Sequence, residues 1–255
     1  MERTSRSSLD RAHGRLGSVS LSCPPPLRES VLHVWFLDLK FDRESLAVQE
    51  DMLSAEEWQR VRRYASSLPG RRFIVRRGLL RRILGGYLNR PPDEVKFVYN
   101  AHGKPFLAPE LSSDLQFSLS DSGDKAAIAV GLGDPVGIDI EWLRTIRLDR
   151  VRISPGTVQR EVAFRGNRSA GEHSFEFFQA WTRREALAKA EGVGLQMLSR
   201  QSDAYGGEDN APTDPGARAA LDRRVFHLHA LTLPAAYVGA LATRPKSPKI
   251  VYYSA

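Results

Sequence analysis

The chain has 255 residues, of which 42% are hydrophobic, enough for one large or two small globular domains with a sizeable core. No run approaches the roughly 20 apolar residues of a membrane span, and residues 1–30 lack the apolar core of a signal peptide. The single cysteine, Cys23, excludes a disulfide framework. We therefore expect a cytoplasmic protein without a membrane partner.

The net charge of +7 is concentrated in one segment. Ten arginines lie between residues 56 and 90 against two glutamates, and this local excess is larger than that of the whole chain. A basic segment of this kind indicates either a phosphate-bearing or acidic partner, or simply a solvated arginine-rich face. Composition alone leaves these alternatives open.

The N-terminal part of the chain predicts a leader followed by a strand and two helices. Residues 1–29 are rich in Ser, Arg, Gly and Pro and predict a disordered leader. Residues 31–37 are apolar on both faces, which is typical of a buried strand. Residues 54–57 form a capping box that begins one helix, and an apolar stripe predicts a second helix over 71–88.

The middle of the chain predicts short strands joined by turns. Strands are expected over 95–99, 115–120 and 125–132, with a turn over 100–105. A Gly- and Pro-containing turn follows residue 130, so the strand over 125–132 and the next strand, 136–142, are expected to form a hairpin.

The C-terminal part predicts one long helix and two strands. The helix is expected over 174–191, after a weakly patterned segment of mixed helix and loop over 144–173. Residues 199–223 are polar and predict a long insertion. Two antiparallel strands are expected over 225–231 and 236–243. Each half of the chain therefore reads as helices packed on antiparallel strands, an α+β pattern.

The stretch 135–142 carries the strongest chemical signal. Side chains alternate along a strand, so Gly137, Asp139 and Glu141 share one face and three apolar residues share the other. Two carboxylates at this spacing repel each other, and a hard cation such as Mg²⁺ is a common way to offset that repulsion. On this stretch alone, a solvent-facing acidic edge is the alternative.

Three further stretches carry polar groups that suit the same chemistry. Lys104 lies on a Gly-Lys-Pro turn, and Ser120 and Asp121 lie at the end of a strand. On the last predicted helix, Glu185 is followed one turn later by Lys189. By themselves, Glu185 and Lys189 equally predict an ion pair on a solvated helix face.

Taken together and in this order, these stretches resemble the 4′-phosphopantetheinyl transferase superfamily, in its Sfp-type class of long, pseudo-dimeric chains. The resemblance spans about residues 31–243, and its last two motifs are specific as a pair. The matching stretches are Gly103-Lys104-Pro105, Phe117 to Ser122, Gly137 to Glu141, and Trp181 to Lys189 followed by Gly192 to Leu195.

The resemblance implies an architecture. It implies two similar α/β subdomains related by a pseudo-twofold axis, with antiparallel sheets packed against helices and the active site at the interface. We expect the N-terminal subdomain over 30–133, the C-terminal subdomain over 134–246 and a tail over 247–255. Because one chain would supply both sides of the site, a monomer is expected.

The resemblance also implies an activity. The enzyme would transfer the 4′-phosphopantetheine arm of coenzyme A, its substrate, to a serine of an acidic apo acyl or peptidyl carrier protein, releasing adenosine 3′,5′-bisphosphate. Mg²⁺, or Mn²⁺ in its place, would be held by Asp139, Glu141 and Glu185. Glu185 and Lys189 are the implied catalytic residues, with Glu185 as the proton acceptor.

The implied contacts with coenzyme A come from both halves of the chain. They are Arg60, Arg63, Arg72, Lys104, Ser120, Asp121, Arg184 and Lys189.

The chain departs from the usual pattern of the family at two of these positions. Asp121 stands where the family usually has His, so it must either accept from a nearby arginine or the metal's water shell, or turn away from the phosphates. Arg184 stands where Lys is usual, and an arginine cannot lose its proton at working pH. A proton-accepting role is therefore excluded for Arg184, while phosphate contact is not.

Two other functions fit parts of the sequence. A catalytically impaired family member that binds coenzyme A or a carrier would account for Asp121. A basic nucleic-acid-binding protein would account for the arginine segment, but it would need interleaved aromatics or a known recognition motif. Neither is seen, and the three carboxylates would have no purpose, so no nucleic-acid partner is expected.

Overall fold

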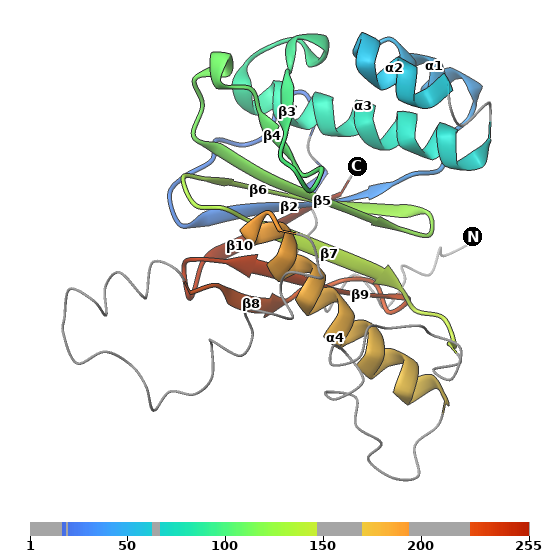
Figure 1. The fold of residues 1–255 in the computed structure, drawn as a ribbon, viewed down its shortest axis with the longest axis vertical. Helices are drawn as coiled ribbons and strands as arrows, with labels where there is room; N and C mark the ends of the chain where they lie inside the picture. Colours follow the sequence, from blue (N-terminus) through green and yellow to red (C-terminus); the bar gives the residue numbers. More distant parts are fainter. Residues whose placement is uncertain (1–16, 19, 63–66, 147–169, 194–224, 255) are drawn as a thin grey trace, which may run out of the picture.

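The computed structural model describes residues 17–18, 20–62, 67–146, 170–193 and 225–254. Figure 1 shows them as layers, with α1 to α3 above a five-stranded sheet, a three-stranded sheet beneath it, and α4 against the smaller sheet. The expected insertion over 199–223 and most of the segment 144–173 lie outside these residues.

The helices match the sequence expectation, with one addition. The additional helix is α1, which the sequence analysis did not anticipate. The helices are α1 (Arg43–Glu50), α2 (Ala55–Arg62), α3 (Leu68–Leu88) and α4 (Ala170–Glu191), with 3-10 turns at Pro92–Glu94 and Pro109–Leu111. The predicted capping box is confirmed at α2, because Ser54 N donates to Glu57 Oε2 at 2.8 Å and Glu57 N donates to Ser54 Oγ at 3.3 Å. None of the described helices is long and apolar enough to cross a membrane.

The strands form two larger sheets and one small hairpin. The five-stranded sheet has the spatial order β1 (Gly17–Ser18), β10 (Lys249–Ser254), β2 (Val31–Asp38), β6 (Lys125–Leu132) and β5 (Leu115–Ser122). The three-stranded sheet has the order β7 (Gly137–Trp142), β9 (Tyr237–Thr243) and β8 (His227–Ala230). The hairpin consists of β3 (Phe97–Tyr99) and β4 (Pro105–Leu107).

The core has one layer on each face of the five-stranded sheet. On the upper face, Trp35 of β2 packs with Ile83 of α3. On the lower face, Val34 packs with Ile138 and Leu241 of the smaller sheet. β2 is therefore buried on both faces, which confirms the interpretation of its continuous apolar run.

The predicted hairpin between residues 125–132 and 136–142 is wrong. β6 pairs with β2 and β5, whereas β7 pairs with β9 in the other sheet. The turn itself is present, with Gly133 at φ +73°, but it carries the chain from one sheet to the next. The reason is that the apolar face of β7 packs against the lower face of the larger sheet, which places β7 beneath that sheet.

The expected leader and tail both contain ordered structure, so the structure differs from the expected boundaries at 29 and 247. Leu21 is 7% exposed and belongs to the upper core layer. β10 lies between β1 and β2 and pairs in parallel with both, so the larger sheet is not purely antiparallel. The difference has a physical reason, because both segments pack against the larger sheet. Leu21 adds to its upper core layer, and β10 pairs with the edge of β2 that would otherwise be free.

The backbone of α4 lies directly on β7 at Gly137. A Cβ at this position would meet Ala186 O at 1.9 Å and Ala190 N at 2.4 Å. Small side chains continue this close contact, since Ala186 and Ala190 pack against Ala240 and Ala242 of β9. Only glycine permits so short a distance between helix and strand.

We expect Gly137→Ala to destabilise the protein by about 1–3 kcal/mol, because the added methyl meets rigid backbone and must push α4 away from β7. Urea unfolding measures this change. Gly131→Ala is the matched control, since its Cβ would meet Leu32 Cδ2, the end of a flexible side chain, at 2.5 Å. An equal loss in the two variants would contradict the proposed cause.

The side chain of His33 belongs to a small cluster of hydrogen-bonded side chains beneath α3. Its Nδ1 lies 2.7 Å from the hydroxyl of Tyr87, which accepts from Trp35 Nε1 at 3.0 Å. The direction of the bond between His33 and Tyr87 depends on which ring nitrogen of His33 carries the proton. Burial lowers the pKa of His33 from 6.5 to about 4.

Stability should fall as pH falls from about 6.5 to about 4, because in this range the unfolded chain binds a proton at residue 33 and the folded chain does not. The slope from this one group approaches at most about 1.4 kcal/mol per pH unit. Unfolding of the wild type and His33→Gln over this range measures it. A variant with the same slope as the wild type would exclude His33 as its source.

Candidate functional site

A cavity of ≈ 420 Å³ opens between α2, α3, β5, the β3–β4 turn and α4. Five of the residues expected from the sequence line it, and they come from four different elements. They are Arg60, Lys104, Asp121, Glu185 and Lys189. The structure therefore brings together residues that are separated by more than 120 positions in the chain.

Serine hydroxyls join β5 to β7 beside this cavity. β5 and β7 are edge strands of different sheets, and side chains rather than backbone groups join them. Ser118, Ser120 and Ser122 of β5 accept from the backbone N–H groups of residues 138, 140 and 142 at 3.1, 3.3 and 3.0 Å. We call these three residues the serine ladder.

The serine ladder also orients the two carboxylates of β7. Ser120 Oγ donates to Asp139 Oδ1 at 2.7 Å, and Ser122 Oγ donates to Glu141 Oε2 at 2.6 Å. The single proton of Ser120 is therefore used on Asp139. This placement differs from the expectation of a direct contact between Ser120 and coenzyme A, and Ser120 does not line the cavity.

Asp139 is the most buried carboxylate of the site, with 5% of its surface exposed. Its Oδ1 also accepts from Lys189 Nζ at 2.7 Å, which joins α4 to β7 through side chains. Its Oδ2 is buried, and among the described residues it has no hydrogen-bond partner. Burial raises the pKa of Asp139, although Lys189 and Ser120 act in the opposite direction.

Glu185 and Glu141 complete a group of three neighbouring carboxylates. Burial raises the pKa of Glu185; Lys189 opposes this, and the negative charges of Asp139 and Glu141 add to it. Glu141 also pairs with Arg144 at 3.4 Å. In this arrangement, no three acidic, His or Cys side chains of the described residues lie close enough together to hold a metal ion.

The donor set nevertheless fits a hard divalent cation. It consists of carboxylate oxygens, and one of them, Asp139 Oδ2, is buried and has no hydrogen-bond partner in the part of the chain that the structure describes. The mutual repulsion of the three groups is of the kind that a cation relieves. Glu141 and Glu185 are both partly exposed.

Lys104 is held by the turn that the sequence predicts over 100–105. Asn100 Oδ1 accepts from Lys104 N at 3.0 Å, and Asn100 Nδ2 donates to Gly192 O at 2.7 Å, which fixes the turn against the end of α4. Lys104 Nζ donates to the backbone carbonyls of Val136 and Lys189. Burial, with a contribution from Lys189, lowers the pKa of Lys104 to about 8.

Asp121 forms an ion pair with Arg76 of α3. This is the arrangement in which the carboxylate accepts from a nearby arginine. Arg76 also lines the cavity, so the pair presents a guanidinium as well as a carboxylate to it. Arg72, expected at the phosphates, instead pairs with Asp124 and is not among the lining residues.

Two further expected residues are not placed at the cavity. Arg63 lies outside the described residues. Arg184 is half-buried on α4 and is not among the residues that line the cavity.

The sequence analysis missed Arg77, which also lines the cavity. A signal for it exists, because Arg77 falls on the apolar stripe of α3 between Phe73 and Leu80, at helical spacing. An arginine on the buried face of a helix needs partners, so its position marks a polar site.

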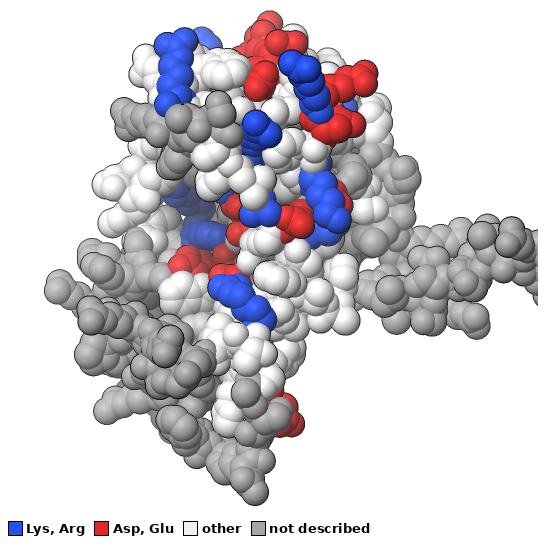
Figure 2. Space-filling view, turned by 90° about the vertical axis from the view of Figure 1, so that its right-hand side faces the viewer, with Lys and Arg blue, Asp and Glu red and all other residues white. Residues whose placement is uncertain are grey.

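The arginine segment is therefore not a uniform basic face. In the face shown in Figure 2, basic and acidic side chains are interspersed across the middle of the molecule. Arginines of this segment form ion pairs with acidic residues: Arg72 with Asp124, Arg76 with Asp121, both Arg77 and Arg81 with Glu57, and Arg90 with Glu94.

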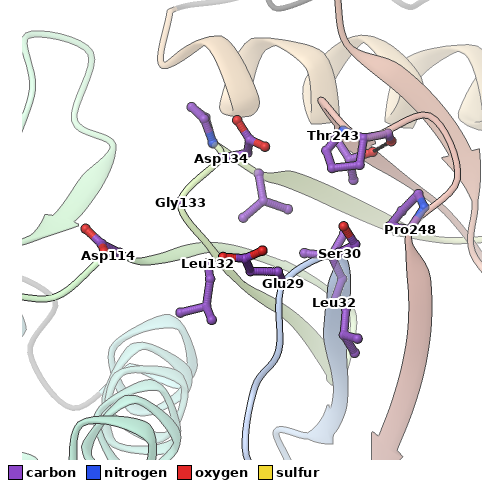
Figure 3. Close-up of a pocket in the computed structure, with 13 residues that line it drawn as sticks. Glu29, Ser30, Leu32, Asp114, Leu132, Gly133, Asp134, Thr243 and Pro248 are labelled. Carbon is purple, nitrogen blue, oxygen red and sulfur yellow. Dashed lines mark hydrogen bonds between the residues drawn. The ribbon is translucent and has the colours of Figure 1, made fainter.

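A second cavity, of ≈ 400 Å³, lies at the opposite ends of β5 and β7 and contains none of the expected site residues (Figure 3). Carboxylates of Glu29, Asp114 and Asp134 line it, each from a different connecting segment. Such a lining does not suit phosphate groups.

Two family profiles and several known proteins match the chain. The profile of the 4′-phosphopantetheinyl transferase N-terminal family matches residues 41–132, and that of the 4′-phosphopantetheinyl transferase superfamily matches residues 135–233. The chain is 34% identical over 185 residues to the 4′-phosphopantetheinyl transferase HetI of Nostoc sp., covering 72% of this chain and 76% of that protein.

More distant relatives carry the same name. The chain is 28% identical to the transferase gsp of Aneurinibacillus migulanus, over 62% of this chain and 64% of that protein. It is 24% identical to the transferase Sfp of Bacillus subtilis, over 64% and 70%. On the extent of these matches, the chain belongs to the 4′-phosphopantetheinyl transferase superfamily.

Proposed function

We propose that this protein transfers the 4′-phosphopantetheine group of coenzyme A to a serine of an apo acyl or peptidyl carrier protein and releases adenosine 3′,5′-bisphosphate. The observation that carries the proposal is the buried Oδ2 of Asp139, which has no hydrogen-bond partner among the described residues. Lys189, which pairs with Asp139, and Glu185 both line the cavity, and that lining is mainly basic. An anionic substrate suits that lining, and a divalent cation suits a carboxylate oxygen.

Asp139, Glu141 and Glu185 would hold Mg²⁺, or Mn²⁺ in its place. When bound, the ion would offset the charge of the pyrophosphate and of the leaving group. Asp139 is prepared for this role by Ser120 and Lys189, which fix Oδ1 and leave Oδ2 for a ligand.

The residues of the chain supply binding and proton transfer. Lys104 and Lys189 lie at the end of the cavity next to the carboxylates, where they would contact the pyrophosphate oxygens. The carrier serine Oγ would bond to the phosphorus that bears the pantetheine arm, as the bond to the bridging oxygen breaks. Glu185, which lines the cavity, would accept the proton of the serine.

The proposal extends to partner and assembly. The net charge of +7 favours an acidic carrier protein. α3 and β5 form one wall of the cavity and α4 forms another, which supports a site between two subdomains of one chain and hence a monomer. Within this proposal the enzyme acts in the cytoplasm, consistent with its single, exposed Cys23.

Incubation with coenzyme A, Mg²⁺ and an apo carrier, followed by the mass of the carrier, tests the function. We expect the carrier to gain one phosphopantetheine group, and EDTA to prevent the gain. Binding of coenzyme A without transfer to any of several carriers would favour the impaired family member instead.

We expect Asp139→Asn and Glu185→Gln each to lower kcat by at least about 100-fold, because each removes a charged ligand or the proton acceptor from the site. Asp134→Asn is the matched control, since it neutralises the same kind of side chain at the other cavity. Thermal unfolding shows whether each variant is folded. Near-normal turnover in either site variant would remove the carboxylates from the mechanism.

We expect Asp121→His to raise the KM for coenzyme A by about tenfold, because the variant loses the carboxylate that holds Arg76 at the cavity. Asp121→Asn, which keeps the shape and removes the charge, should have the same sign of effect. Steady-state kinetics with varied coenzyme A measures both. A gain in affinity and turnover for Asp121→His would mean that Asp121 merely impairs the site.

A further inference from the structure

The C-terminal end of α4 is completed by a side chain from the β3–β4 turn. Gly192 follows the helix with φ +72°, and Val193 N donates to Ala188 O at 3.0 Å, as in a Schellman motif. The carbonyl of Gly192 lies beyond this motif and accepts from Asn100 Nδ2 at 2.7 Å. Carbonyl groups at a helix end need partners from outside the helix, and Asn100 supplies one from 92 positions earlier in the chain.

The same side chain closes the β3–β4 turn. Asn100 Oδ1 accepts from His102 N and from Lys104 N, both at 3.0 Å. An atom that accepts from two N–H groups must be the amide oxygen, so the amide nitrogen is the end that faces Gly192. Asn100 therefore uses one end of its amide to hold the turn and the other end to bind the end of α4.

Asn100 acts from outside the cavity of the candidate site. Lys104 of the turn lines this cavity, as do Lys189 and Gly192 at the end of α4, whereas Asn100 is not among the lining residues. Its effect on a reaction in the cavity is therefore exerted through the residues that it connects.

The two lysines at this junction need a fixed spacing. Their positive charges repel each other, and Lys189 contributes to the lowered pKa of Lys104. Lys104 Nζ donates to Lys189 O, but a phosphate in the cavity would compete for the same ammonium group. The bond from Asn100 to Gly192 has no such competitor, because the Asn100 side chain does not line the cavity. It can therefore hold the spacing while a substrate is bound.

We propose that Asn100 is a positioning residue, whose amide holds the β3–β4 turn in register with the end of α4. The register matters because the turn carries Lys104, whereas α4 carries Glu185 and Lys189, and under the proposed function, on which this inference rests, all three act on one substrate molecule. A rigid helix transmits a displacement of its end to both side chains. A misplacement of about 1 Å between reacting groups can lower a rate by about 100-fold.

Two substitutions remove the bond to α4 and keep the turn. Asn100→Asp retains an oxygen for the two N–H groups of the turn but places a second carboxylate oxygen against Gly192 O. Asn100→Ser retains a shorter, uncharged acceptor that does not span the distance to Gly192. We expect each to lower kcat by at least about tenfold and to leave the KM for coenzyme A within about threefold of the wild type, as steady-state transfer to an apo carrier measures.

Two further variants separate positioning from a general loss of structure. Asn100→Ala also removes the acceptor of the turn, so it should raise KM as well as lower kcat. Asn89→Asp is the matched control, since it makes the same exchange at the C-cap of α3, away from the cavity lining. It should lower Tm and leave kcat and KM within about twofold. A lower Tm with unchanged kcat in the Asp and Ser variants of Asn100, or a higher KM without a lower kcat, would overturn the proposal.

Hydrogen exchange tests the bond between Asn100 and α4 without turnover. In Asn100→Asp and Asn100→Ser, the amides in the last turn of α4 should exchange at least about threefold faster than in the wild type, and those of α3 should be unchanged. Unchanged exchange at the end of α4 would contradict the proposal. If the wild type transfers nothing to any carrier, the proposed function fails, while the exchange rates still decide whether Asn100 holds the end of α4.

Discussion

The site depends on how the free edge of β7 is satisfied. β7 ends the smaller sheet and β5 ends the larger one, so both present unpaired backbone groups to each other. The serine ladder fills this gap, since each hydroxyl accepts from one N–H of β7. A buried N–H without a partner would cost about 1–3 kcal/mol, so the ladder is a structural requirement before it is a functional one.

The same hydroxyls connect structure to chemistry. A hydroxyl that accepts from the backbone still has a proton to donate, and Ser120 and Ser122 give theirs to Asp139 and Glu141. The carboxylate orientation is thus fixed by groups that the sheet junction already needs. The close approach of α4 at Gly137 adds Lys189 from the other side, where it fixes Oδ1 of Asp139. Rigid elements therefore hold the proposed metal ligands on two sides.

Local patterns in the sequence predicted elements better than they predicted pairings. Alternation of apolar and polar residues identified β5 and β7. The wrong hairpin followed from the turn before β7, since turn chemistry predicts a reversal of the chain but not which sheet receives the next strand. The sequence analysis did not predict β10, because Pro245, Pro248 and neighbouring lysines give its segment the composition of a tail. In the structure, β10 lies between β1 and β2.

In the candidate site, too, local patterns predicted some features and not others. Strand alternation placed Asp139 and Glu141 on one face of β7, and the resemblance to the family added Glu185 from the last helix. The roles of the arginines were harder to predict, because the composition of a segment with ten arginines does not show which of them are buried. Arg72 was expected at the phosphates and pairs with Asp124, whereas Arg77 was missed and lies at the cavity wall. The two arginines lie on different faces of α3, and the face on which a residue lies decides whether its side chain is buried.

The effect of Asp121 on phosphate binding depends on the charge of all the residues that line the cavity. A carboxylate where the family usually has histidine exchanges a hydrogen-bond donor for a negative charge on β5. Arg76 faces that position from α3, so the ion pair restores a donor at the same wall and carries it on a different element. Five basic residues, among them Arg60 and Lys104, line the cavity, and Asp121 and Glu185 are the acidic residues among its described lining. The lining therefore keeps a net positive charge, which favours a phosphate group.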